Sequence, residues 1–328
     1  MRWTSFSSLM RKIKVADIKP LFFLVLFLLG APFSYAASER ALEFQTFAAI
    51  GFDDNPRLTA PRRSDFFAQE TVLARYRKTL NPLMRLRLSS DIVNINYFEA
   101  THENLLPLEA AAGLDLKLAP HTILEMDYTF EYVDFPNDDP AVFLEHKARA
   151  GLRQRVSRTL ELKGGVDAAS IGFEEQKTRD AAGVLSAGKE RGDARLGADT
   201  EINFLPQDNL LFKSGFVYFH NDSNDLFHDF YDYDSYKVYA GASNLWNPKL
   251  SASFRFSYEK RQYDARPLVD DASMSQDDDV YTAGGTLFYN IRNGLSLGLA
   301  YSYREKSSNE PSQSYSGAIS TLGLYYSF

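Results

Sequence analysis

The sequence predicts an all-β fold, a single antiparallel up-and-down transmembrane β-barrel of about 14 strands. Three observations predict it. Apolar and polar residues alternate with a period of two along most of the chain, short and long connections alternate between these segments, and a secretory leader precedes them. A chain that crosses a membrane without apolar helices must pair all its backbone groups, which only a closed barrel allows.

The leader occupies the first 36 residues. Basic residues such as Arg11 and Lys14 precede an apolar run over 21–29, and Ser34-Tyr35-Ala36 supplies the small residues that a signal peptidase reads. The apolar run is too short for a spanning helix, which needs about 20 residues. We expect 1–36 to be a signal peptide and 37–328 to form an outer-membrane β-barrel.

Composition excludes several classes of protein. The chain of 328 residues contains 36 Lys and Arg, 43 Asp and Glu, and no Cys. Without Cys it forms neither a disulfide scaffold nor a thiolate metal site, and thiol catalysis is excluded. The acidic balance argues against a nucleic acid partner. We expect no cofactor.

The strands are predicted from the alternation. In 105–118, for example, Leu114 and Leu116 alternate with Asp115 and Lys117, which gives one apolar and one polar face. Most segments have ten to fifteen residues, a length suited to tilted strands that cross a bilayer. Strands are expected at 41–52, 66–78, 83–98, 105–118, 122–133, 142–156, 160–173, 191–204, 210–220, 235–246, 249–262, 280–291, 295–306 and 316–328.

The connections predict the orientation of the barrel. The short ones contain turn formers, as in Asn81-Pro82, Asn247-Pro248 and Asn293-Gly294. The long, polar ones are expected near 53–65, 99–104, 134–141, 174–190, 221–234, 263–279 and 307–315. Both ends of the barrel segment lie on the short-turn side. Outer-membrane barrels have this arrangement, with short periplasmic turns and long outer loops.

The last strand carries an assembly signal. Leu324, Tyr326 and Phe328 alternate up to a C-terminal Phe. This pattern resembles the closing-strand signal that the barrel-assembly machinery recognises in many bacterial barrels. We therefore expect this machinery as a partner, together with outer-membrane lipid and lipopolysaccharide.

Charged rows are expected on the face that lines the lumen. They could form a constriction that sorts solutes by charge. They could equally form cross-strand ion pairs that brace a filled interior, and the sequence leaves both readings open. The rows are Arg75, Arg77, Arg85, Arg87, Lys147, Arg149, Arg153 and Arg155, with Glu125, Asp127 and Glu131 of opposite sign.

Two acidic loops are weak candidates for cation binding. Asp222 and Asp225 lie in one, and Asp277, Asp278 and Asp279 in the next. Hard divalent cations favour carboxylates, but the spacing does not match the calcium-binding loop. We expect no bound metal and favour solvated loops, bridged to lipopolysaccharide by loosely held cations.

Catalysis at the rim is the third functional hypothesis. His220, Asp222 and Ser223 are close in sequence, but catalytic triads are usually assembled from separate segments. We therefore expect no enzymatic activity and rank a barrel hydrolase last.

The start of the first long loop carries a family resemblance. Gly51-Phe52-Asp53-Asp54-Asn55 resembles a motif of β-barrel porin families often encoded near exopolysaccharide synthesis and export functions. A physical reading stands beside it, because Asp and Asn terminate a strand and Pro56 prevents its continuation. The larger members carry a periplasmic helical repeat domain that this chain lacks, which argues against a stand-alone exporter.

The resulting prediction is a non-enzymatic narrow channel, or an accessory pore that works with polysaccharide-export components. A structural or surface-interaction barrel, with side chains filling its lumen, is the alternative.

Overall fold

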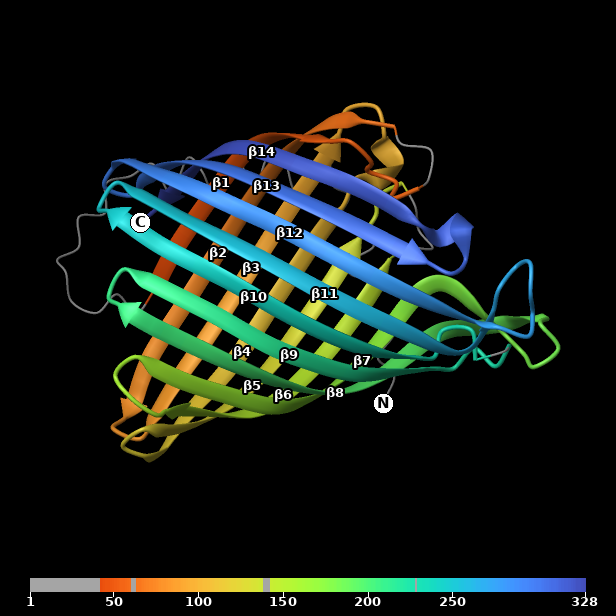
Figure 1. The fold of residues 1–328 in the computed structure, drawn as a ribbon, viewed down its shortest axis with the longest axis horizontal. Coiled ribbons are helices and arrows are strands. Elements are labelled where there is room, and N and C mark those ends of the chain that lie inside the picture. The colour runs from red at the N-terminus through yellow and green to blue at the C-terminus, as the bar shows by residue number, and fades with distance from the viewer. Residues whose placement is uncertain (1–41, 60–62, 138–141, 228) are drawn as a thin grey trace. The chain divides into compact units, whose positions relative to one another are not determined.

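The computed structural model describes residues 42–59, 63–137, 142–227 and 229–328. The expected signal peptide lies outside them. The strands form one closed antiparallel barrel in sequence order (Figure 1). They are β1 (Leu42–Asp53), β2 (Asp65–Asn81), β3 (Met84–Tyr97), β4 (Leu106–Ala119), β5 (Thr122–Asp134), β6 (Phe143–Arg155), β7 (Leu160–Arg179), β8 (Leu185–Gln207), β9 (Leu210–Ser223), β10 (Tyr233–Asn247), β11 (Leu250–Pro267), β12 (Ser275–Arg292), β13 (Leu295–Ser308) and β14 (Tyr315–Ser327).

Two short 3₁₀ turns, η1 (Thr101–Glu103) and η3 (Pro311–Gln313), lie in the long loops. No helix in the described part of the chain has the length and apolar character needed to cross a membrane. The predicted fold class and the alternation of short and long connections are confirmed. The short turns lie together with the C-terminus at one end, and the long loops lie at the other (Figure 1).

The barrel closes where β1 pairs with β14, from Gln45 opposite Ser327 to Asp53 opposite Ile319. The Phe44 amide donates to the Phe328 carbonyl at 3.2 Å, the Phe328 amide donates to the Phe44 carbonyl at 3.1 Å, and their rings stack with centroids 5.8 Å apart. The C-terminal Phe is thus part of the closing seam. Pairing both edges of the sheet leaves no open strand edge.

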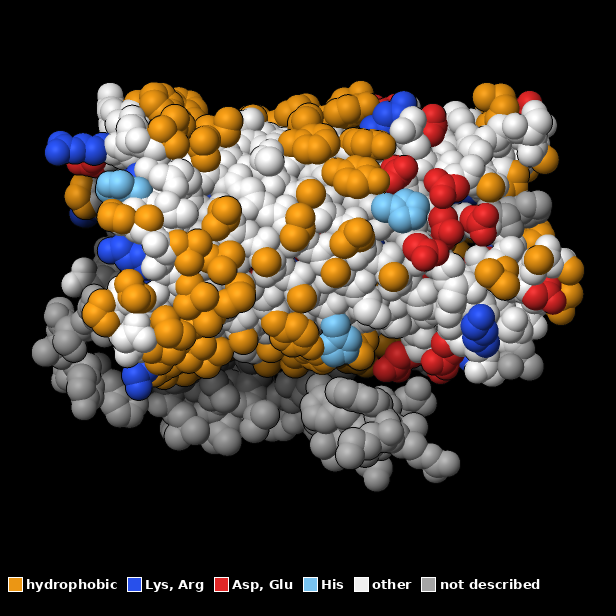
Figure 2. All heavy atoms as spheres, turned by 90° about the horizontal axis from the view of Figure 1, so that it is seen from below, with side chains coloured by type: hydrophobic (Ala, Val, Ile, Leu, Met, Phe, Trp, Pro, Cys, Tyr) orange, Lys and Arg blue, Asp and Glu red, His pale blue; other side chains and the backbone are white. Residues whose placement is uncertain are grey.

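The two faces of the wall differ because successive side chains in a strand point to opposite sides. Leu324 of the closing strand pairs with Ala48 and Leu297 on the outer face, where it is 49% exposed. Figure 2 shows apolar side chains spread over the outside of the barrel, while acidic side chains gather towards the long-loop end. An apolar outer surface on a closed barrel suits contact with lipid.

Four strands extend five or six residues further into the long loops than predicted. β7 continues to Arg179 and β8 already begins at Leu185. The loop expected at 174–190 is therefore reduced to 180–184. β11 and β12 shorten the expected 263–279 loop to 268–274 in the same way. Alternation ends where both faces of a hairpin meet polar surroundings, although backbone pairing continues. The predicted boundaries, which relied on alternation, were therefore wrong at these four strand ends.

Candidate functional site: the wall of the lumen

The predicted charged rows lie on the inner face of β2 to β6. On β3, for example, Arg85 and Arg87 alternate with Leu86 and Leu88, and Leu88 is 41% exposed on the outside. The inner residues pair strand to strand in register, with Arg87 opposite Gly113 and Gly113 opposite Asp127. The wall therefore brings together charges that are far apart in the chain.

The first group of charges spans β3 to β6. The Arg87 guanidinium lies 2.8 Å from both Asp115 and Asp127. Arg153 lies 2.9 Å from Glu125 and 3.7 Å from Asp115. Asp115 is buried, so its two arginine partners offset the cost of removing a carboxylate from water.

The second group links β6 to β8. Arg149 donates to Asp199 through Nε and Nη2, both at 2.8 Å, and lies 4.0 Å from Glu125. Such a two-pronged contact is the strongest ion-pair geometry available to arginine. Lys147 has a weaker partner in Asp167, at 3.4 Å.

Two glycines allow these arginines to reach over an intervening strand. Arg87 crosses Gly113 to reach Asp127, and a Cβ at Gly113 would lie 2.9 Å from the guanidinium carbon. Arg149 passes Gly165, where a Cβ would lie 2.7 Å from Nη2. The sequence interpretation missed both glycines. The signal that could have found Gly113 is an Arg, a Gly and an Asp at matching register on successive strands. Gly165 lies opposite Asp199 but two residues from the position opposite Arg149, so this pattern does not identify it.

Four cations of the predicted rows lack such partners. Arg75, Arg77, Arg85 and Arg155 are exposed, and none forms an ion pair with any acidic residue that the structure describes. All four lie in the half of the lumen near the short turns, together with Lys117 on the same inner face. The wall thus contains cations that form ion pairs and, nearer the short turns, exposed cations that do not.

Glu131 lies away from both groups. Its register partners on β4 and β6 are Glu109 and Glu145, and Glu109 in turn lies opposite Asp91 on β3. This acidic row, defined as Asp91, Glu109, Glu131 and Glu145, crosses four strands on the inner face further from the short turns. Like charges directly opposite one another destabilise a sheet. Among the described residues, Glu131 forms no ion pair with the basic rows.

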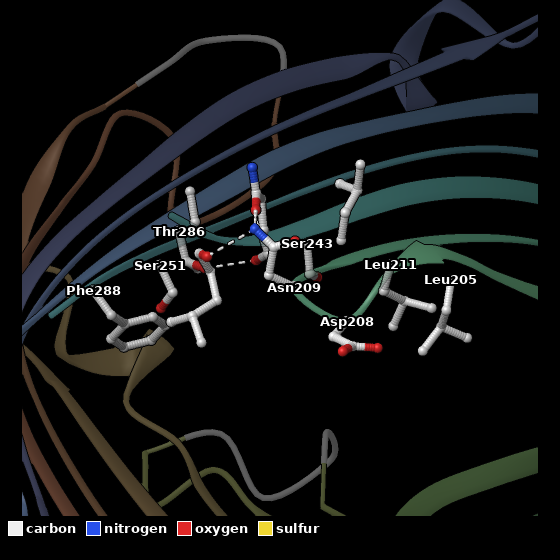
Figure 3. A pocket seen from close by; sticks show the side chains of 13 residues that line it. Leu205, Asp208, Asn209, Leu211, Ser243, Ser251, Thr286 and Phe288 are labelled. Atoms are coloured by element: carbon white, nitrogen blue, oxygen red, sulfur yellow. Dashed lines mark hydrogen bonds between the residues drawn. The ribbon is translucent and has the colours of Figure 1, made fainter. Parts of the chain in front are cut away.

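The cavities along the short-turn half of the wall include three of about 310 to 460 Å³. One of about 460 Å³ lies along β9 to β12 and is lined by apolar, hydroxyl and amide side chains and by Asp208. Figure 3 shows Ser243, Ser251 and Thr286 between Phe288 on one side and Leu211 on the other. The two others, of about 310 and 320 Å³, lie along β2 to β7 and are lined by arginines.

Side chains of β7 and β8 pack against the loop that precedes β10 at the long-loop end. Arg179 bonds to Asp225 at 3.2 Å and lies over the rings of Phe227 and Phe230, at 4.8 and 4.7 Å. Arg191 lies over Tyr231 at 3.4 Å. These contacts hold residues 224–227 and 229–232 against β7 and β8. Within this loop, burial, followed by repulsion from neighbouring aspartates, raises the pKa of Asp232 to about 6.

The weak metal candidates are divided between two faces. Asp225 is paired with Arg179, and Asp278 faces inward, 2.8 Å from Lys306. Asp222, Asp277 and Asp279 occupy outer-face positions, where Asp279 accepts a hydrogen bond from the Tyr258 hydroxyl at 2.6 Å. Among the residues that the structure describes, no group of three or more potential ligands is placed to hold a metal ion.

The rim residues considered for catalysis are not assembled. His220 faces outward and lies 3.2 Å from Asp234, whereas Ser223 is buried on the inner face, where its backbone amide donates a hydrogen bond to Asp232 Oδ1 at 2.7 Å. Asp222 shares the outer face with His220, but Ser223 points to the opposite side of the sheet.

The Gly51–Asn55 segment connects the start of the first long loop to the adjacent strands through packing and hydrogen bonds. A Cβ at Gly51 would lie 2.2 Å from the Phe67 ring, so only glycine fits here. Asp53 accepts a hydrogen bond from the Tyr97 hydroxyl at 2.9 Å, and buried Asn55 donates to the carbonyls of Thr59 and Ser316 at 2.8 Å. These contacts give the segment a structural role, because they stabilise the arrangement of β1, β3 and β14.

Comparison with known proteins places the chain among bacterial outer-membrane barrels. The family model described as surface lipoprotein assembly modifier matches residues 189–324, less than half of the chain. A search of curated proteins found no match. OmpT of Vibrio cholerae, an outer membrane protein, is 10% identical with a TM-score of 0.51, and the match covers 90% of this chain and 100% of that one. The outer membrane channel DcaP of Acinetobacter baumannii is 11% identical with a TM-score of 0.50, over the same shares. At these identities the likeness concerns the fold. The chain has the closed antiparallel fold of an outer-membrane β-barrel, with short turns at one end and long loops at the other.

Proposed function

We propose that the protein is a non-enzymatic outer-membrane channel with a wide periplasmic half and a narrow outer half. The observation that carries this proposal is the difference between the two halves of the inner wall. The periplasmic half contains cavities of about 310 to 460 Å³ and exposed, unpaired arginines. A lumen filled for purely structural reasons would instead pair these charges, because unpaired charges in a confined interior are costly.

Single-channel recording of the refolded protein in planar bilayers tests this proposal. We expect small, stable conductance steps whose ion selectivity depends on salt concentration, since the exposed wall charges are screened by salt. A protein that is folded, as judged by heat-modifiable migration, but has no conductance would reject the channel. It would favour the alternative of a structural or surface-interaction barrel with a filled lumen.

An accessory pore of an envelope polysaccharide pathway is a more specific form of this proposal. It is supported by the resemblance of Gly51–Asn55 to porin families of exopolysaccharide loci. Its partners would be polysaccharide-export components. Loss of surface polysaccharide in a deletion strain, restored by the intact chain, is the expected result. Unchanged polysaccharide would limit the proposal to a general channel.

A second candidate function is assistance in the assembly of surface lipoproteins. It is supported by the family match over 189–324, which extends from β8 to β14 and includes the cavity of about 460 Å³. Protease treatment of intact deletion cells would test it. Lipoproteins that lose surface exposure in the deletion strain would favour this candidate over a solute channel.

A further inference from the structure

We propose that the periplasmic half of the lumen contains a binding site for an oligomeric anion, one that bears several phosphate or carboxylate groups along a chain. The basic site is defined as Arg75, Arg77, Arg85, Lys117 and Arg155 on the inner face of β2, β3, β4 and β6. This inference deepens the proposed channel function by naming the class of ligand that enters from the periplasm.

The first argument is that nearby carboxylates are already engaged. Asp115 lies directly opposite Arg85 in register, yet its oxygens bond to Arg87 at 2.8 Å and Arg153 at 3.7 Å. Glu161 lies opposite Arg155, but it accepts a hydrogen bond from Asn203 at 3.3 Å and lies 3.9 Å from Lys163. The wall therefore leaves several cations uncompensated although acids lie beside them.

The second argument is that the strand register places like charges together. Arg77 lies directly opposite Arg87, an arrangement that destabilises a sheet in the absence of a counterion. Arg87 has two carboxylate partners, whereas Arg77 has none among the described residues. A bound anion would offset this repulsion. Arginine is well suited to this role, because its planar guanidinium matches the geometry of phosphate and carboxylate.

The third argument concerns space. The cavity of about 310 Å³ is lined by Arg75 and Arg77, and the cavity of about 320 Å³ by Arg85, Lys117 and Arg155. Two neighbouring cavities with separate cations suit a chain with repeated charges better than a single small ion. Glu43 and Asp91 also lie on this wall: Glu43 faces Arg75 in register, and Asp91 is close enough to Arg75 to interact electrostatically. Arg75 is therefore the least available of the five cations.

The acidic row determines where the ligand stops. Asp91, Glu109, Glu131 and Glu145 cross β3 to β6 further along the same wall, towards the outer end. Glu145 lies 3.7 Å from Arg195, so the repulsion of an anion that moves beyond the basic site comes from Asp91, Glu109 and Glu131. We therefore expect the anion to be held in the periplasmic half, and its binding to be stronger from that side.

The test uses the refolded, full barrel and two probes, inorganic tripolyphosphate and trigalacturonate, which separate phosphate from carboxylate ligands. The inner variant is Arg77→Gln/Arg85→Gln/Arg155→Gln. The control variant is Lys78→Gln/Arg158→Gln/Lys249→Gln, which removes three charges at the same end, from outward-facing Lys78 and from two turns. Binding is measured by calorimetry at low salt in detergent micelles, so the result does not depend on conductance.

We expect the inner variant to bind at least one probe about tenfold or more weakly than the parent, and the control to bind within about twofold. Preference for one probe identifies the anionic group. In bilayers, the same probe should block current more strongly from the periplasmic side. Equal binding by both variants, or no binding by the parent, would overturn the inference. Binding of a probe without any conductance would reject the channel function but support the anion site. Failure of the channel proposal can therefore be distinguished from failure of the anion-site inference.

Discussion

The contact between Arg149 and Asp199 is expected to be the most stabilising ion pair of the lumen wall. Replacement of Arg149 by Met removes two hydrogen bonds of 2.8 Å and leaves Asp199 without its partner. Charge-assisted hydrogen bonds contribute about 1.5–3 kcal/mol each, but both side chains here are 21% exposed, so water weakens the effect. We expect Arg149→Met to lower the free energy of unfolding by about 3 kcal/mol.

Urea unfolding in lipid vesicles, followed by the fluorescence of Trp246, measures this change. Trp246 is 56% exposed near the short-turn end, and the other tryptophan of the chain, Trp3, lies within the expected signal peptide. Lys147→Met is the control, because Lys147 lies 3.4 Å from Asp167 and is 40% exposed; we expect less than about 1 kcal/mol. In the double variant Arg149→Met/Asp199→Asn, the loss of unfolding free energy should be smaller than the sum of the two single losses. Both charges are then removed, so no unpaired charge is left in the wall. Equal effects of Arg149→Met and Lys147→Met would refute the reasoning.

Four other predictions follow from the structure. Deletion of Phe328 removes the last backbone pairs to Phe44 and should reduce outer-membrane insertion; normal amounts of heat-modifiable protein would contradict this. On intact cells, protease should cleave within 180–184 and 268–274 but not at the turn over 247–249, and the reverse pattern would show that the orientation is inverted. Glu131→Gln reduces repulsion within the acidic row and should raise stability by up to about 0.5 kcal/mol in the same urea assay, whereas a loss above about 1 kcal/mol would indicate an unseen cationic partner. Because the pKa of Asp232 is raised to about 6, the folded loop binds a proton more tightly than the open loop, so protease protection of 224–232 should be greater at pH 5 than at pH 7.5. Asp232→Asn should remove that pH dependence, and an unchanged dependence would assign it to another group.

The order and number of strands could be predicted from the sequence because alternation is a local property. A strand with one apolar face must present it to lipid, and Pro or Asn between two such strands marks a turn. The predicted segment at 105–118 therefore nearly coincides with β4 (Leu106–Ala119). The prediction failed where the local signal ends, as in β7, which continues to Arg179 through polar residues held by pairing to β8.

The faces of the charged residues were also predictable from local alternation, since Arg75, Arg87 and Arg149 each alternate with apolar neighbours. Their partners were not. Arg87 reaches Asp127, 40 positions further along the chain, only because the register places Gly113 between them. A shift of the register by one residue would exchange the faces and remove that contact.

The sequence by itself determined that this chain forms a barrel, which end carries its short turns and which side chains line its interior. These properties follow from periodicity and turn chemistry over a few residues. Only the tertiary structure decided that Arg149 is braced while Arg77 is unpaired, and that Glu131 lies in a row of carboxylates. The physical reason is that electrostatic energy depends on distances between neighbouring strands, which the closure and register of the whole barrel set together.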